Sequence, residues 1–193
     1  MKKTVLILII VFSVSCTQRR KKDIEISDEF KLEFLNEILS DTSNLKIISN
    51  KEQLITFGEL IPGVMPIHPN GGSTISHFEF IADSLETQDI DFIRQQWIKN
   101  KDFDFMQLKN YGFRVFDLQK LRQETKSNDL FDTLEIMNEG HKSFYRTIIT
   151  VPVFNEKKDK AYLMVNNYGG ATYILKMENG KWEIESKIHE YVE

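Results

Sequence analysis

Residues 144–188, FYRTIITVPVFNEKKDKAYLMVNNYGGATYILKMENGKWEIESKI, contain four β-rich segments separated by short polar turns. The segments are FYRTIITVPVF, AYLMVNNY, ATYILKM and KWEIESKI. β-Branched and aromatic residues favour strands, and Asn179-Gly180 between two alternating runs is a strong hairpin signal. The stretch therefore predicts a four-stranded antiparallel meander. Pro152 predicts a sheet edge or a bulge in the first strand, because proline cannot donate to a ladder.

The last run alternates apolar and charged side chains, which predicts one buried face and one wet face. Trp182, Ile184 and Ile188 are expected to face the core. The charged residues expected to face water are Lys181, Glu183, Glu185 and Lys187.

The chain before the meander has mainly helical periodicity. Residues 28–39, DEFKLEFLNEIL, place five apolar side chains on one helical stripe, and Ser27 is a fitting N-cap. A second helix is predicted from Thr87 or Asp89 to about Lys99. The remaining predicted elements are helices at 116–123 and 129–138 and strands at 45–49 and 75–81. These patterns predict an α+β domain over 28–193, with the helices packed on one face of the meander.

The meander resembles the C-terminal sheet of many small lipoproteins from Bacteroidota, in which a Pro-x-Phe strand leads to an aromatic hairpin and a Gly-Lys-Trp strand. The matching residues are Pro152, Val153, Phe154, Tyr168, Gly169, Gly170, Gly180, Lys181 and Trp182. More loosely, helices followed by a curved meander are similar to nuclear transport factor 2-like and cystatin-like folds. The resemblance implies a fold and no activity.

The N-terminus has the pattern of an export signal. Lys2 and Lys3 precede the apolar run VLILIIVF and small residues that lead to Cys16, the only cysteine. The apolar run is shorter than the roughly 20 residues that a membrane-spanning helix needs. Residues 1–15 are therefore expected to be a signal peptide.

Ser15 and Cys16 resemble the lipobox of bacterial lipoproteins, although Ser13 stands where that motif usually has leucine. The resemblance implies that Cys16 becomes the N-terminus and carries lipid. Residues 16–27 would then form a basic tether at the membrane, and the protein would face the periplasm. An ordinary secreted protein with a free cysteine is the alternative.

The predicted tether is basic, whereas the rest of the chain carries more acidic than basic residues. Without Lys2 and Lys3 the chain keeps 23 basic and 29 acidic residues, and four of the basic ones are the RRKK of residues 19–22. Nucleic-acid binding is disfavoured, because phosphate recognition needs basic clusters on the folded part. The expected partners are the membrane, through the lipid, and an unknown protein or envelope component.

Motifs for chemistry are weak throughout the chain. His68, His77 and Glu79 could meet around a metal, but zinc-site spacing is missing. Ser73 in NGGST lacks the glycine of a nucleophile elbow. The acidic pairs Asp89/Asp91, Asp102/Asp104 and Asp129/Asp132 and the loop-side tyrosines Tyr111, Tyr168 and Tyr173 fit structural positions as well as functional ones. The sequence assigns no catalytic residue, metal or cofactor.

Residues 60–74, LIPGVMPIHPNGGST, predict a long loop with three prolines and three glycines. Long loops in compact domains are usually functional or disordered. His68, Asn70 and Ser73, with His77 beside them, are therefore the candidate binding residues. The leading interpretation is a lipid-anchored periplasmic binding domain, in one version an immunity protein that neutralises a toxin. The alternative is an envelope hydrolase with a cone-shaped pocket.

Overall fold

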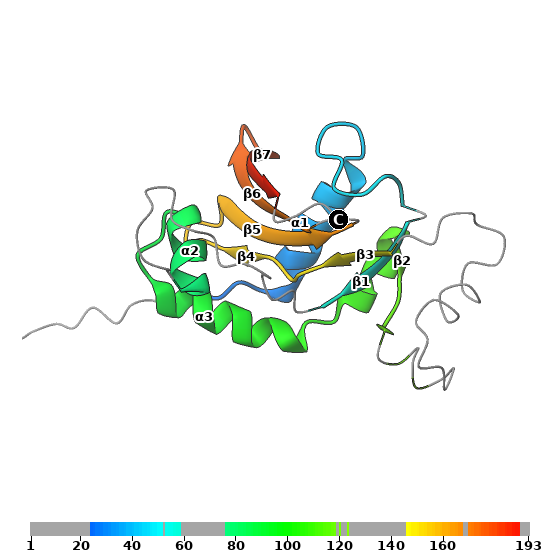
Figure 1. Cartoon of the computed structure of the whole chain (residues 1–193), viewed down its shortest axis with the longest axis horizontal. Coiled ribbons are helices and arrows are strands. Elements are labelled where there is room, and N and C mark those ends of the chain that lie inside the picture. Colours follow the sequence, from blue (N-terminus) through cyan, green and yellow to red (C-terminus); the bar gives the residue numbers. More distant parts are fainter. Residues whose placement is uncertain are drawn as a thin grey trace, which may run out of the picture.

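A curved mixed β-sheet with helices packed against it forms the folded part of the protein (Figure 1). The computed structural model describes residues 24–51, 53–58, 76–118, 120, 123, 146–167 and 170–189. The strands are β1 (Leu54–Phe57), β2 (Arg114–Val115), β3 (Arg146–Ile149), β4 (Val153–Phe154), β5 (Lys160–Asn166), β6 (Gly170–Glu178) and β7 (Lys181–His189). The helices are α1 (Asp28–Ser40), α2 (His77–Ser84) and α3 (Ile90–Lys99), with the short 3-10 helices η1 (Asn100–Asp102) and η2 (Phe105–Tyr111). The predicted α+β class is confirmed.

The strands from β3 onward form the predicted antiparallel run. Strand order in the sheet is β2-β1-β3-β5-β6-β7, and β4 pairs with β5 beside β3. The turn between β6 and β7 is Asn179-Gly180, whose residues have φ angles of 51° and 78°, as a tight hairpin of this type requires. The sequence did not predict β1 and β2, which extend the sheet by parallel pairing.

The first strand of the meander is interrupted at Pro152, as its sequence predicts. Ile149 pairs with Val165 and Val153 pairs with Tyr162, so three residues on one side face two on the other. One residue too many on one strand is the definition of a β-bulge. The bulge turns the chain between β3 and β4, and Thr150 and Val151 come to lie beside the end of β1.

A second bulge corrects the predicted alternation of the last strand. Leu175 pairs with Ile184 and Ile174 pairs with Ser186, so Glu185 is the extra residue. After Glu185, each side chain of β7 lies on the face of the sheet opposite to the one that the simple alternation predicts. Lys187 pairs with Tyr173, on the same face as Trp182, and Ile188 lies on the opposite face.

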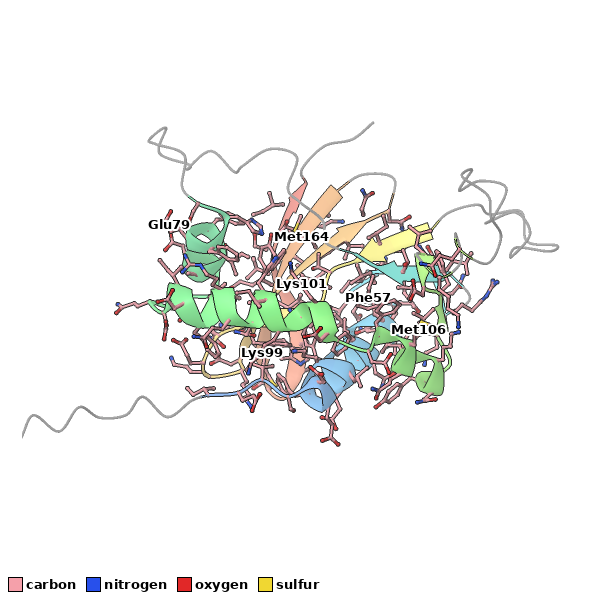
Figure 2. The ribbon with its side chains drawn as sticks, turned by 90° about the horizontal axis from the view of Figure 1, so that it is seen from below. Phe57, Glu79, Lys99, Lys101, Met106 and Met164 are labelled. Carbon is pink, nitrogen blue, oxygen red and sulfur yellow. The ribbon has the colours of Figure 1, made fainter. Side chains whose placement is uncertain are left out.

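The helices lie on both faces of the sheet, so the prediction that one face carries them was incomplete. One core cluster joins α1 to the face that carries Leu163 and Leu175, and the other joins α2 and α3 to Tyr162 and Ile174. Helix α3 runs along the edge formed by β4 (Figures 1 and 2). Phe92 on α3 packs against both clusters.

The first helix forms as its sequence predicts. The Ser27 hydroxyl accepts a hydrogen bond from the Phe30 N–H at 3.2 Å, and two acidic residues follow in the first turn. The buried apolar stripe of α1 lies against Trp182, whose ring centroid is 4.7 Å from that of Phe34. The inward position predicted for Trp182 is confirmed.

Two predicted strands are absent from the described residues. In the stretch predicted as a strand at 75–81, His77 begins α2 instead, because Ser76 and Glu79 form a capping box at the start of that helix. Residues 45–49 form turns and bends, and β1 follows a few residues later. The helix predicted to end at Lys99 is α3, with Asp89 as its N-cap.

Of the helix predicted at 116–123, Leu118, Lys120 and Gln123 are helical. The helix predicted at 129–138 lies outside the described residues. Among the residues that the structure does describe, none of the helices is long and apolar enough to span a membrane.

Lys160 joins β5, β7 and the chain after α2 through an ion cluster in which the lysine is buried and its two carboxylate partners are partly or largely exposed. Its ammonium group lies 2.8 Å from Glu86 and 2.7 Å from Glu185, and its side chain is 8% exposed. Burial acts to lower the pKa of Lys160, but the hydrogen bonds that its ammonium group donates to Glu185 and Glu86 outweigh burial and raise that pKa. The Lys160 hydrogen bond lowers the pKa of Glu86.

We expect Lys160→Met to destabilise the domain by about 1.5–3 kcal/mol at neutral pH, the usual contribution of hydrogen bonds to charged groups. The two pKa shifts fix the pH dependence. The Lys160 contribution is lost as pH rises through its raised pKa, and the Glu86 contribution is lost as pH falls through its lowered pKa. Urea unfolding of both proteins should therefore show the largest difference between these limits. An equal difference in strong acid would contradict this account.

Candidate functional site

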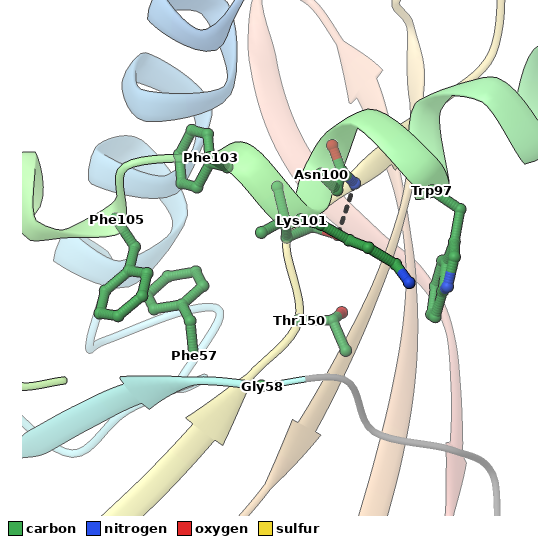
Figure 3. Close-up of a pocket in the computed structure, with 9 residues that line it drawn as sticks. Phe57, Gly58, Trp97, Asn100, Lys101, Phe103, Phe105 and Thr150 are labelled. Carbon is green, nitrogen blue, oxygen red and sulfur yellow. Dashed lines mark hydrogen bonds between the residues drawn. The ribbon is translucent and has the colours of Figure 1, made fainter. Parts of the chain in front are cut away.

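A pocket of about 460 Å³ opens where β1 ends and α3 passes into η1 (Figure 3). We call it the Trp97 pocket. The described residues that line it are Phe57, Gly58, Trp97, Asn100, Lys101, Phe103, Phe105, Thr150 and Val151. Its volume is within the range of small-molecule sites. The bulge before β4 supplies one wall, since Thr150 and Val151 belong to it.

Three phenylalanine rings make one end of the Trp97 pocket apolar. Phe57 at the end of β1 stacks on Phe105 at the start of η2, with centroids 4.9 Å apart and planes 17° from parallel. Phe103 lies 6.2 Å from Phe57 in a tilted arrangement. Figure 3 shows the three rings together on one side of the pocket. A flat apolar group would find ring faces and edges here.

The other end of the pocket carries hydrogen-bond donors and a positive charge. Figure 3 shows the Lys101 side chain extending from η1 toward Trp97, with Thr150 across from it. The Thr150 hydroxyl accepts from the Met164 N–H at 3.0 Å, which leaves its own O–H to donate. Trp97 carries an indole N–H. No carboxylate is among the described residues of the lining.

Asn100 holds the wall in place. Its Nδ2 donates to the carbonyl oxygens of Val151 and Pro152, at 3.3 and 3.1 Å, and so fixes the bulge against the end of α3. Its Oδ1 is buried without a hydrogen-bond partner. The carboxyl end of α3 contributes partial negative charge, but a helix end is worth only about 0.3–1 kcal/mol. Lys101, in η1, brings a positively charged side chain to the same end of the pocket.

Of the four predicted binding residues, the structure describes His77 alone, and it places His77 beside the Trp97 pocket. His77 is the first residue of α2, and its ring meets that of Trp97 edge to face at 5.2 Å. Tyr162 lies 6.0 Å from the same ring. Both His77 nitrogens are buried and have no hydrogen-bond partner among the residues that the structure describes, and burial lowers the pKa of His77. His77 is thus neutral at pH 7 and packs behind a pocket residue.

His68, Asn70 and Ser73 lie outside the described residues, so the prediction of an exposed binding loop stays a prediction. In the sequence, the predicted loop of residues 60–74 starts two positions after Gly58, which lines the Trp97 pocket.

The other candidates occupy structural positions where they are described. Asp89 caps α3, Asp91 pairs with Arg94, and Asp104 caps η2. Glu79 belongs to the capping box, whose hydrogen bond from the Ser76 backbone lowers its pKa. No set of three or more potential metal ligands is found in the described part of the chain.

The tyrosines differ from one another. Tyr173 is buried in the core, whereas Tyr111 is 39% exposed on η2. Tyr168 and the Asp129/Asp132 pair lie outside the described residues.

Sequence reasoning missed the Trp97 pocket because its lining comes from three separate segments, residues 57–58, 97–105 and 150–151. The available signal was the run WIKNKDFDF at 97–105, where aromatic residues alternate with charged ones directly after a predicted helix. Comparison with family models, characterised proteins and solved structures finds no match for this chain. The function must therefore be argued from the site itself.

Proposed function

We propose that this protein is a lipid-anchored binding protein of the bacterial envelope that holds its ligand in the Trp97 pocket. The observation that carries the proposal is the lining, which combines three phenylalanines and a tryptophan with a few polar side chains. Pockets for small molecules are typically apolar and aromatic, with a few polar groups that orient the ligand.

An envelope hydrolase is the alternative function, and the residue types that line the pocket disfavour it. Acid–base catalysis of hydrolysis generally uses His, Asp or Glu within hydrogen-bond reach of the reacting group. None of these residue types is among the described residues that line the Trp97 pocket. His77 is packed behind Trp97, and burial keeps it neutral.

The proposal can be tested in the envelope by photo-crosslinking. Benzoylphenylalanine at position 105 places the reactive ketone in the pocket, and the same residue at exposed position 33 on α1 is the control. We expect an adduct of defined mass from position 105 that position 33 does not give and that Trp97→Ala reduces. Equal adducts from both positions would contradict a ligand in this pocket.

The anchor is a separate part of the proposal, and we expect Cys16→Ser to abolish it. Only a thiol accepts the diacylglyceryl group in the lipoprotein pathway that the Ser15-Cys16 motif resembles. Two or more acyl chains give stable membrane attachment. Detergent phase partitioning should place the wild type in the detergent phase and the variant in the aqueous phase. If both remain aqueous and neither carries lipid by mass spectrometry, the anchor is disproved.

A further inference from the structure

Two exposed isoleucines lie where the N-terminal segment meets the end of α3. In the described part of the chain the exposed large apolar residues are Ile24, Ile98 and Tyr111. Ile24 is 41% exposed and Ile98 is 57% exposed. Each directly precedes one partner of an ion pair, in which the Lys99 ammonium lies 3.0 Å from the Glu25 carboxylate. Two of the three exposed apolar side chains therefore share one corner of the fold, which we call the Ile98 corner.

The folded part holds both isoleucines in place. Ile98 lies away from Ile93 and Gln96, the buried residues of α3. Ile26, two positions after Ile24, is buried in the same core cluster as α1. Figure 2 shows residues 24–27 running beside α3. The exposure of the two isoleucines is therefore a property of the packed structure and not of a frayed end.

The predicted lipid anchor is joined to the fold at this corner. Eight residues lead from Cys16 to Ile24, and they include the RRKK of residues 19–22. Eight residues span at most about 29 Å when fully extended, so an acylated Cys16 would keep Ile24 within that distance of the membrane. Basic residues beside a lipid anchor are attracted to anionic headgroups.

We propose that the Ile98 corner docks on the anionic membrane that holds the lipid anchor, with Ile24 and Ile98 in the headgroup region. The proposal rests on the anchor of the proposed function and adds the surface of the fold that faces the lipid. Apolar side chains flanked by charged ones suit such an interfacial contact, because the charged groups stay in the headgroup layer. Figure 1 shows α3 and β7 on opposite sides of the fold, so β7 faces away from the membrane.

A fluorescent probe at position 98 of the mature lipidated protein tests this orientation. Cys16 is the only cysteine, and its sulfur carries the lipid, so Ile98→Cys provides one free thiol for a nitrobenzoxadiazole label. Glu183→Cys is the matched control, because Glu183 is exposed on β7. Both proteins would be reconstituted in vesicles of phosphatidylethanolamine and phosphatidylglycerol that contain a lipid with a spin label near the headgroup.

We expect the spin-labelled lipid to quench the probe at 98 at least about twofold more strongly than the probe at 183. Ile24→Asp should weaken quenching at 98, because anionic headgroups repel a carboxylate and the apolar contact is lost. Ser186→Asp adds the same charge at an exposed position of β7 and should leave quenching at 98 unchanged.

The outcomes separate this proposal from the anchor and from the pocket. Equal quenching at 98 and 183 in a protein that carries lipid would overturn the docked orientation and leave the anchor intact. A probe at 98 that is protected from aqueous iodide but not quenched by the lipid would show that protein covers the corner, which also overturns the proposal. Absence of lipid on Cys16 by mass spectrometry would disprove anchor and docking together. The Trp97 pocket is tested independently by the crosslinking experiment.

Discussion

Trp182→Ala should destabilise the domain by about 3–5 kcal/mol, the usual cost of truncating a large aromatic residue in a core. The Trp182 side chain is 5% exposed and meets Phe34 edge to face at 4.7 Å. Phe154 from β4 lies 6.1 Å away in the same cluster. Removing the indole leaves a cavity between α1 and the sheet. Urea unfolding followed by circular dichroism measures the loss.

Glu183→Ala is the matched control, because Glu183 is the next residue of β7 and is exposed. It should change stability by no more than about 0.5 kcal/mol. Trp182→Phe should fall between the two, since it keeps a ring against Phe34. A loss for Trp182→Ala as small as that for Glu183→Ala would show that the α1–β7 contact contributes little to folding.

Gln96→Leu should cost about 2–6 kcal/mol, although leucine is similar to glutamine in size and suits a buried position. The Phe154 N–H donates to Gln96 Oε1 at 3.0 Å, and Gln96 Nε2 donates to the Phe154 carbonyl at 2.7 Å. Gln96 is 5% exposed, so leucine would leave two buried backbone groups unpaired. Each such group costs about 1–3 kcal/mol.

Gln95→Leu provides the control, because Gln95 is the exposed neighbour on α3. Hydrogen exchange distinguishes the lost hydrogen bonds from a packing defect. The Phe154 amide should exchange faster in Gln96→Leu, by more than the change in global stability accounts for. If protection of that amide falls only in step with global stability, the side chain of Gln96 does not protect the β4 edge by itself.

Local patterns predicted those elements whose signals lie within one segment. Ser27 and the stripe Phe34, Leu35 and Ile38 determine α1, and Asn179-Gly180 determines the β6–β7 turn. The aromatic and β-branched residues of the stretch 75–81 predict a strand, but Ser76 and Glu79 also form a capping-box pattern, and the capping box decides that α2 begins here.

The candidate site was predicted only in part. His77 was expected at a binding surface, and it lies against Trp97 at the wall of the pocket. Lys101 and Thr150 were not singled out, since neither belongs to a motif. They lie more than 40 positions apart and line the same pocket only because α3 packs along the β4 edge.

The sequence by itself determined the α+β class, the antiparallel order of the C-terminal strands, the cap of α1 and the inward face of Trp182. Each depends on periodicity or turn chemistry within about ten residues, where the backbone geometry alone relates side chains to one another.

Only the tertiary structure decided the bulge at Glu185, the parallel addition of β1 and β2, and the use of both sheet faces. It also decided the Trp97 pocket, whose walls meet because Asn100 and Gln96 bond to backbone groups more than 50 residues away. Such contacts arise from the packing of α3 on the sheet. A one-dimensional pattern does not encode the distance between segments that far apart.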